Sequence, residues 1–359
     1  MRRRTTEARA ANACTSPGRY DDDPRPRPIE DSAISRHLLA RVIGLVVIAV
    51  LAIVGIGAGL ILPGQTAGAP SSTAAPSGPA TVPTAPVAAV SGPTPAPTSV
   101  DRYLAPSGSD ASAGTMDAPW ATLAGAAAHL VPGQTLWVRG GRYVLGETDW
   151  TASGSATAPI TVRGYPGEQP VFDGNGSEDK FLWLHGGAAW IVLADLHVLG
   201  YKTAETGVIS VSDGSHDVTF RNVEVDGNRG GTTQDHLIYL AAPGVHDVTI
   251  AGCVLAGASG AAIHVYHTPA ATAIRITGNH ITDAHWGVML YSGTNDVVVS
   301  GNQFTNVDVA VRLERATNVS LLDNVASGTA GIQVVGPPVL AQYIDEGNTW
   351  PAPVQQVSP

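Results

Sequence analysis

The sequence predicts an all-β fold: a single-stranded right-handed parallel β-helix with an N-terminal capping helix, preceded by one transmembrane α-helix and a disordered stalk. Three observations support this prediction. A short apolar motif recurs every 22 to 30 residues, a second alternating motif lies between its copies, and an unbroken apolar run precedes both. The expected boundaries are a cytoplasmic tail over 1–37, the membrane helix over 38–62, an extracellular linker over 63–99 and the β-helix domain over 100–359.

The N-terminal 37 residues combine clustered charge with few apolar side chains. Three arginines follow the first methionine, and residues 21–28 alternate charged residues with proline. Such a segment buries too little apolar surface to fold, so we expect a disordered tail.

The run from Val42 to Leu62 contains only apolar residues and glycine. About 21 residues are enough to cross a hydrocarbon core of roughly 30 Å. Arg36 and Arg41 precede the run, and the next basic residue is Arg102. The positive-inside rule therefore predicts a cytoplasmic N-terminus and an extracellular β-helix domain at the cell membrane. A cleaved signal peptide is the alternative, but the apolar core is longer than the 7–15 residues usual for one.

Residues 63–99 carry no charge and consist mainly of Pro, Ala, Ser, Thr and Gly. Repeated prolines favour an extended polyproline II chain of about 3.1 Å per residue. The segment is therefore predicted to be a stalk between the membrane and the folded domain.

The remaining chain contains a repeat whose period falls in the range of solenoid proteins. Its equivalent positions are Ile191, Val218, Val248, Ile274, Val297 and Val319. A second short motif alternates apolar and other residues, as a strand with one buried face does. Its first residues are Leu182, Ile209, Ile238, Ile263, Val288, Val311 and Ile332. Several short strands per repeat with no helix between them predict stacked coils rather than a βαβ sheet.

The end of the first motif is rich in asparagine. We align Asp195, Asn222, Cys253, Asn279, Asn302 and Asn324 at one position. Asparagine tolerates left-handed backbone geometry and forms hydrogen-bonded ladders between stacked strands. We interpret these residues as architectural.

The start of the domain contains an Ala-rich segment near 120–130 and then the sequence Pro132-Gly-Gln-Thr-Leu-Trp-Val-Arg-Gly-Gly-Arg-Tyr143. Over residues 101–145 this resembles the opening of secreted pectate-lyase-like β-helix proteins, in which a short strand and a capping helix lead into the first coil. The resemblance implies the fold and says little about the reaction, because one fold hosts many functions.

Charge limits the partners. From residue 100 onward about nine Arg and two Lys stand against about 24 acidic residues, roughly −13. Such a surface repels phosphates, so we expect no nucleic acid partner. A polyanion would need a local basic cluster or a metal ion. Calcium stays open as a cofactor, although the sequence shows no acidic ligand cluster, and we expect no protein metal site.

Stacking the second motif places two columns of outward side chains on one wall, in rungs roughly 4.8 Å apart. The first column is Trp183, Ser210, Tyr239, His264, Met289, Arg312 and Gln333. The second is His185, Ser212, Ala241, Tyr266, Tyr291, Glu314 and Val335. Aromatic faces stack on sugar rings, so the wall predicts a site for a polysaccharide or cell-wall glycan. Aromatic ladders that only stabilise the sheet are the alternative.

A long loop over 226–235 leads into His236 at the edge of this wall, and long loops on rigid scaffolds often carry function. In a uronate lyase a cation neutralises the substrate carboxylate and a base removes the adjacent proton. The candidate catalytic residues are His236, Tyr239, His264 and Arg312. The candidate substrate-binding residues are Trp183, Tyr266, Tyr291, Glu314, Asp235 and Arg229, the last a second candidate neutraliser. A simple turn that begins a strand is the alternative for Asp235 and His236.

The functional prediction is a membrane-anchored extracellular β-helix protein that acts on or binds polysaccharide, with a uronate polysaccharide lyase as its enzymatic form. The calcium cluster and R-x-P-x-x-R segment of β-helix pectate lyases are absent from the sequence, as are the motifs of polygalacturonases and alginate epimerases. A glycoside hydrolase would need two carboxylates flanking the scissile bond, and no such pair is fixed here. A non-catalytic glycan-binding or structural cell-surface protein is therefore the alternative.

Overall fold

The computed structural model describes residues 101–176, 180–203, 206–227, 231–241, 243–266, 271–328, 330–336 and 342–358. The predicted tail, membrane helix and linker lie outside these residues. Within the described part of the chain, no helix has the length and apolar character needed to cross a bilayer.

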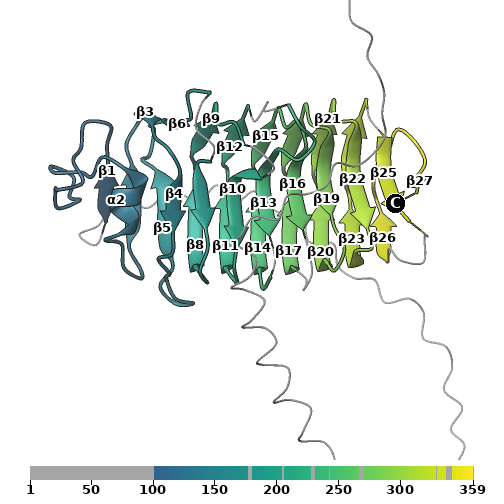
Figure 1. Ribbon diagram of the computed structural model, residues 1–359, viewed down its shortest axis with the longest axis horizontal. Helices are drawn as coiled ribbons and strands as arrows, with labels where there is room; N and C mark the ends of the chain where they lie inside the picture. The colour runs from purple at the N-terminus through teal and green to yellow at the C-terminus, as the bar shows by residue number, and fades with distance from the viewer. Residues whose placement is uncertain are drawn as a thin grey trace, which may run out of the picture. The chain divides into compact units, whose positions relative to one another are not determined.

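The domain is a right-handed parallel β-helix, as predicted, and it has about eight turns (Figure 1). Each full coil contributes one strand to each of three parallel sheets. The ten-stranded sheet is formed by β1 (Arg102–Leu104), β2 (Thr135–Val138), β5 (Ile160–Gly164), β8 (Ala189–Ala194), β11 (His216–Arg221), β14 (His246–Ala251), β17 (Thr272–Thr277), β20 (Asn295–Ser300), β23 (Thr317–Leu322) and β26 (Tyr343–Glu346).

The nine-stranded sheet is formed by β4 (Thr148–Trp150), β7 (Leu182–Leu184), β10 (Gly207–Ser212), β13 (His236–Ala241), β16 (Ala261–Tyr266), β19 (Trp286–Leu290), β22 (Val309–Glu314), β25 (Ala330–Val335) and β27 (Gln355–Val357). The eight-stranded sheet is formed by β3 (Gly141–Val144), β6 (Pro170–Asp173), β9 (His197–Leu199), β12 (Glu224–Asp226), β15 (Val254–Ala256), β18 (His280–Thr282), β21 (Gln303–Thr305) and β24 (Val325–Ser327).

The register between coils is the one that the repeats predicted. In the ten-stranded sheet Ile191 lies against Val218, and the same column continues through Val248 to Val319. In the nine-stranded sheet the column from Leu182 to Ile332 is likewise unbroken. These columns point inward and are buried, so each coil adds a layer to one continuous apolar core.

One end of the stack is covered by the helix α2 (Leu123–Ala127) (Figure 1). The Thr122 hydroxyl caps it by accepting the Gly125 N–H at 2.9 Å, and Leu123 and Ala126 are buried against the first coils. The helix is shorter than the predicted 120–130.

The asparagine ladder is present, but the alignment of its first members was wrong by one residue. The register places Asp195 and Asn222 level with Gly252 and Gly278, where the backbone φ angle is positive in each coil. The buried ladder lies one residue later, and its amides are those of Asn279, Asn302, Asn324 and Asn348. Each Nδ2 donates to the side-chain oxygen of the next rung or to a core carbonyl, so the role is architectural as predicted.

Replacing Asn302 by Ala should lower the free energy of unfolding by about 3 kcal/mol or more, because it leaves the buried Asn279 N–H and amide without their acceptor. Denaturant unfolding of the full-length protein measures this change. The neighbouring variant Gln303→Ala removes an exposed side chain and should cost less than about 0.5 kcal/mol. Equal costs for the two variants would contradict a stabilising ladder.

Candidate functional site

The candidate site lies on the outward face of the nine-stranded sheet. The strand register confirms both predicted columns, from Trp183 through His264 to Gln333 and from Ser212 through Tyr266 to Val335. We name the cluster of Tyr239, His264, Tyr266 and Tyr291 the aromatic wall. These residues come from β13, β16 and the position after β19, which are successive rungs of the stack.

The sequence did not reveal a third column on this face. From β10 to β25, two consecutive residues near the start of each strand of this sheet are buried, as Leu237 and Ile238 show, so the residue before them also lies on the outer side. This column places His236 level with Ala261 and Trp286. A strict alternation of inward and outward residues cannot predict this column, because two consecutive inward residues shift the alternation by one position.

His236 and His264 form a buried pair between adjacent rungs. His236 is 2% exposed and His264 is 3% exposed, and Nε2 of the first lies 2.9 Å from Nδ1 of the second. The Ala261 N–H donates to His236 Nδ1 at 2.9 Å, so the proton of a neutral His236 lies on Nε2 and is donated to His264. His264 must then carry its own proton on Nε2.

Burial keeps both imidazoles neutral. It lowers the pKa of His236 to about 4, although the neighbouring Asp235 carboxylate acts in the opposite direction. Burial also lowers the pKa of His264 to about 2, and both His236 and the Arg312 guanidinium add to that effect. His264 Nε2 is buried and has no hydrogen-bond partner among the described residues. The pair therefore offers one oriented N–H donor.

Three tyrosine rings surround this donor. The ring of Tyr239 lies 5.3 Å from that of His264, Tyr266 lies 5.3 Å away edge-on, and Tyr291 lies 6.2 Å away edge-on. Tyr266 packs on Tyr239 at 5.9 Å and on Tyr291 at 5.0 Å, so the rings form a continuous ladder across three rungs. Burial raises the pKa of Tyr239 to about 12, so its hydroxyl stays protonated.

Arg312 lies two rungs beyond His264 and is held by several partners. It donates to Gln333 Oε1 at 3.0 Å, pairs with Glu314 at 3.6 Å, and lies 5.0 Å from the Trp286 ring centroid. Trp286 and Gln333 are site residues that the sequence analysis did not select. The guanidinium Nε is buried and has no hydrogen-bond partner in the described part of the chain.

The other predicted residues lie further out. Trp183 lies two rungs before Tyr239, stacks on His185 at 4.2 Å and donates to Ser212 Oγ at 2.7 Å. The Asp235 carboxylate accepts the Thr232 N–H at 2.9 Å, which closes the turn before β13 as the structural alternative predicted. Arg229 lies outside the described residues.

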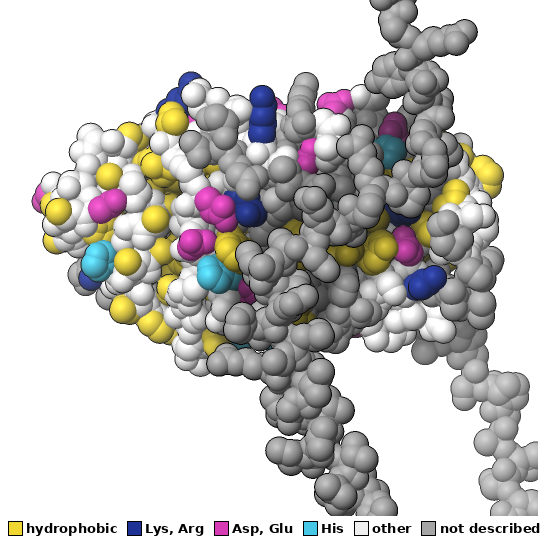
Figure 2. Space-filling view, viewed as in Figure 1, with side chains coloured by type: hydrophobic (Ala, Val, Ile, Leu, Met, Phe, Trp, Pro, Cys, Tyr) yellow, Lys and Arg dark blue, Asp and Glu magenta, His cyan; other side chains and the backbone are white. Residues whose placement is uncertain are grey.

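Among the described residues, no group of three His, Cys, Asp or Glu side chains lies close enough to hold a metal ion. Figure 2 shows one face of the domain, on which the Lys and Arg side chains lie singly rather than in a patch.

Residues 102–246 match the family described as Pel9A-like, right handed beta helix region, and residues 206–336 match the family described as right handed beta helix region. The pectate lyase PEL9 of Emericella nidulans is 41% identical over 81 residues, which cover 22% of this chain and 20% of that protein. The match therefore spans about one fifth of the relative's length.

Solved structures share the fold at low identity. A glycoside hydrolase superimposes with a TM-score of 0.50 and 9% identity, covering 72% of this chain and 96% of the other. Pectate lyase Pel9A superimposes with a TM-score of 0.47 and 15% identity, covering 72% and 73%. At 9% identity, the likeness to the glycoside hydrolase shows the fold alone.

The depressed pKa values of His236 and His264 predict a pH-dependent stability. The unfolded chain binds protons on these residues below about pH 6.5, whereas the folded chain does not bind one on His236 until about pH 4. The free energy of unfolding should therefore decrease as the pH is lowered from about 6.5 to about 4, by roughly 3 kcal/mol from His236 alone. Denaturant unfolding at a series of pH values measures the slope.

The control for this prediction is His264→Gln, which keeps an acceptor for His236 and removes one titrating group. Its stability should depend less steeply on pH than that of the unmodified protein. Imidazole NMR signals of His236 or His264 that titrate near pH 6.5 would contradict the assignment.

Proposed function

The chain belongs to the pectate-lyase-like right-handed parallel β-helix superfamily, and on this basis we propose that it binds an extracellular polysaccharide along the aromatic wall. The observation that supports this function is the ladder of Tyr239, Tyr266 and Tyr291 around the unpaired His264 N–H.

The tyrosines suit an extended sugar chain. A tyrosine side chain combines a large apolar face with a polar hydroxyl end. A sugar ring likewise has an apolar C–H face and polar hydroxyl edges, so the two surfaces match. The three rings rise by one rung each, roughly 4.8 Å, along the axis of the stack. A linear glycan lying along this axis would meet one ring after another.

His264 adds an oriented hydrogen-bond donor to this surface. A neutral imidazole whose Nδ1 is already occupied cannot accept a proton at Nε2, but it can donate one hydrogen bond. A glycan oxygen inserted between the rings would give that buried N–H its acceptor, which removes the cost of leaving it unpaired. The same geometry makes His264 a poor general base.

Arg312 would bind a hydroxyl or a carboxylate at the far end of the wall. Its charge is partly offset by Glu314 at 3.6 Å, so it favours an acidic sugar less than a free guanidinium would. The ligand class is therefore a polysaccharide with hydroxyl-rich rings, and a uronate polymer is included in that class.

A uronate polysaccharide lyase is the second candidate. It is supported by the Pel9A-like match over residues 102–246 and by the partial identity with a pectate lyase. Arg312 would neutralise the substrate carboxylate, but the buried neutral histidines and the protonated Tyr239 offer no ready base. Binding is therefore the function that the geometry supports better.

We also propose that the domain is held outside the cell by the apolar run 42–62, with the N-terminus in the cytoplasm. The support for this part is the length of the run and the basic residues before it.

Tyr266→Ala and Tyr291→Ala should each weaken polysaccharide binding by about tenfold, because each removes one stacking ring. Calorimetric titration of the full-length protein with the best ligand of a polysaccharide panel measures this loss. The control Tyr165→Ala removes a half-buried tyrosine outside the wall, next to Trp137, and should leave the affinity unchanged. Unaltered binding in both wall variants would reject the proposed site.

The uronate lyase function is tested by incubating the full-length protein with uronate polymers and measuring the absorbance of unsaturated chain ends. Turnover that is lost in Arg312→Gln would favour a lyase at this wall. Absence of unsaturated ends with every polymer, with and without calcium, would count against it.

In cells, the full-length protein should sediment with membranes and be digested by protease added from outside, because the β-helix domain is expected on that side. Replacing Ile48 and Val54 by Lys should release it from the membrane fraction, since charges inside an apolar span are costly. Recovery of unmodified protein in the soluble fraction would contradict the anchor.

A further inference from the structure

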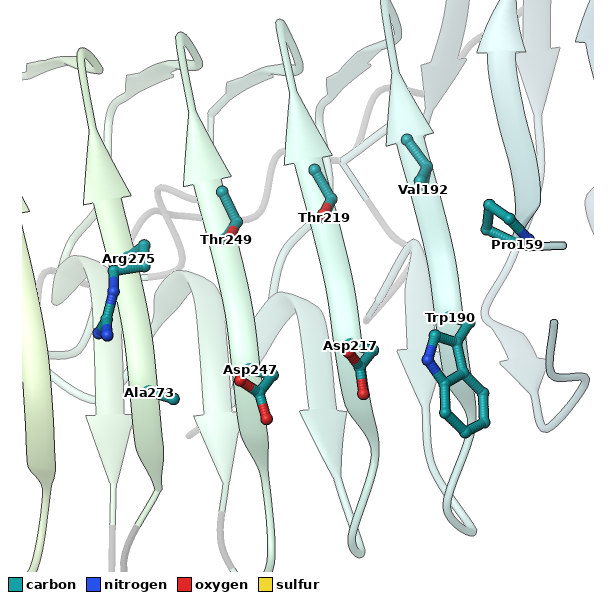
Figure 3. Close-up of a pocket in the computed structure, with 9 residues that line it drawn as sticks. All are labelled: Pro159, Trp190, Val192, Asp217, Thr219, Asp247, Thr249, Ala273 and Arg275. Atoms are coloured by element: carbon teal, nitrogen blue, oxygen red, sulfur yellow. The ribbon is translucent and has the colours of Figure 1, made fainter. Parts of the chain in front are cut away.

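A groove of about 380 Å³ lies on the outward face of the ten-stranded sheet, a different sheet from that of the aromatic wall (Figure 3). It runs across four successive rungs, from β8 through β11 and β14 to β17. Trp190 lies toward one end and Arg275 toward the other, and two rows of side chains form the floor between them. The feature is therefore long in the direction of the stack, as a linear ligand would require.

The first row consists of one residue per coil. These residues occupy the register position before the inward column, and they are Trp190, Asp217, Asp247 and Ala273. Their φ angles all lie between 52° and 56°. The second row, Val192, Thr219, Thr249 and Arg275, is also in register. Rungs roughly 4.8 Å apart repeat at nearly the length of one sugar residue in an extended chain.

The two aspartates are held in place by histidines. His216 Nδ1 lies 2.6 Å from Asp217 Oδ2, and His246 Nδ1 lies 2.7 Å from Asp247 Oδ2. The two imidazoles stack at 4.6 Å with 7° between their planes, which keeps the carboxylates parallel. The second oxygen of each carboxylate has no hydrogen-bond partner among the described residues, so it can accept from a ligand.

The ends of the groove differ in chemistry. Trp190 is half-buried and packs edge-on against His216 at 5.0 Å. Arg275 is bound to the Asp296 carboxylate at 3.1 and 3.3 Å, so its charge is already offset. Between these ends the groove presents the carboxylates of Asp217 and Asp247, which repel a uronate and attract a cation.

We propose that this groove is a second carbohydrate site, which binds a short oligosaccharide with protonated amino groups. A sugar ring would stack on Trp190, and amino groups on the following residues would pair with Asp217 and Asp247. Hydroxyls would meet the side chains of Thr219 and Thr249. This site is independent of the aromatic wall and differs from it in favouring a positively charged ligand.

The test is calorimetric titration of the full-length protein with a glucosamine tetramer at neutral pH, beside an N-acetylglucosamine tetramer of the same length. The free-amine tetramer should bind at least about tenfold more tightly than the acetylated one, because only the former carries positive charge. Trp190→Ala and the double variant Asp217→Asn, Asp247→Asn should each weaken binding about tenfold.

Asp283→Asn is the matched control. It changes an exposed aspartate with the same left-handed backbone, on another corner of the stack, and should leave the affinity unaltered. The aspartate to asparagine changes keep side-chain size, so they remain informative if Trp190→Ala does not fold. Equal affinity for the two tetramers, absence of binding, or full binding by the double variant would overturn the proposal. None of these outcomes bears on polysaccharide binding at the aromatic wall.

Discussion

The structure depends on one constraint, the parallel backbone register between successive coils. Once Ile191 lies against Val218, each later coil repeats the same pairing, and each inward side chain is covered by its neighbours above and below. The amides of Asn279, Asn302 and Asn324 reinforce this register from inside the turn, since each one bonds both the next rung and a core carbonyl. A surface in which residues some 25 positions apart become neighbours follows directly from this stacking.

The same constraint sets the chemistry of the aromatic wall. Stacking brings His236 and His264 into contact and buries them under the rings of neighbouring rungs, so both pKa values fall. A catalytic base needs a pKa near the working pH and a free lone pair. His264 has neither, because Nδ1 is occupied by its partner. Burial thus converts a residue pair that looks catalytic in sequence into a fixed hydrogen-bond donor.

The repeat pattern was sufficient to predict the fold, the register and two outward columns, because inward apolar residues recur at a fixed position in each coil. It was not sufficient where the alternation of inward and outward residues breaks, as at Leu237 and Ile238, which places His236 on the outer side. It also did not separate the positive-φ position shared by Asn222 and Gly252 from the ladder position that follows it. The repeat pattern also did not predict which side chains pair across rungs. The Arg312 environment depends on Glu314, Gln333 and Trp286 meeting across rungs, and a sequence gives neither distances nor rotamers.

A scaffold of this kind can carry more than one binding surface, since the backbone needed for each is already present. Inward residues are fixed by the core, whereas outward residues affect mainly their own column. The aromatic wall combines tyrosines with a guanidinium, and the groove on the ten-stranded sheet combines a tryptophan with paired carboxylates. Both present one group per rung at the same spacing, so both match a polymer that repeats at nearly that length. The difference between them is charge, and charge decides which sugar each surface would select.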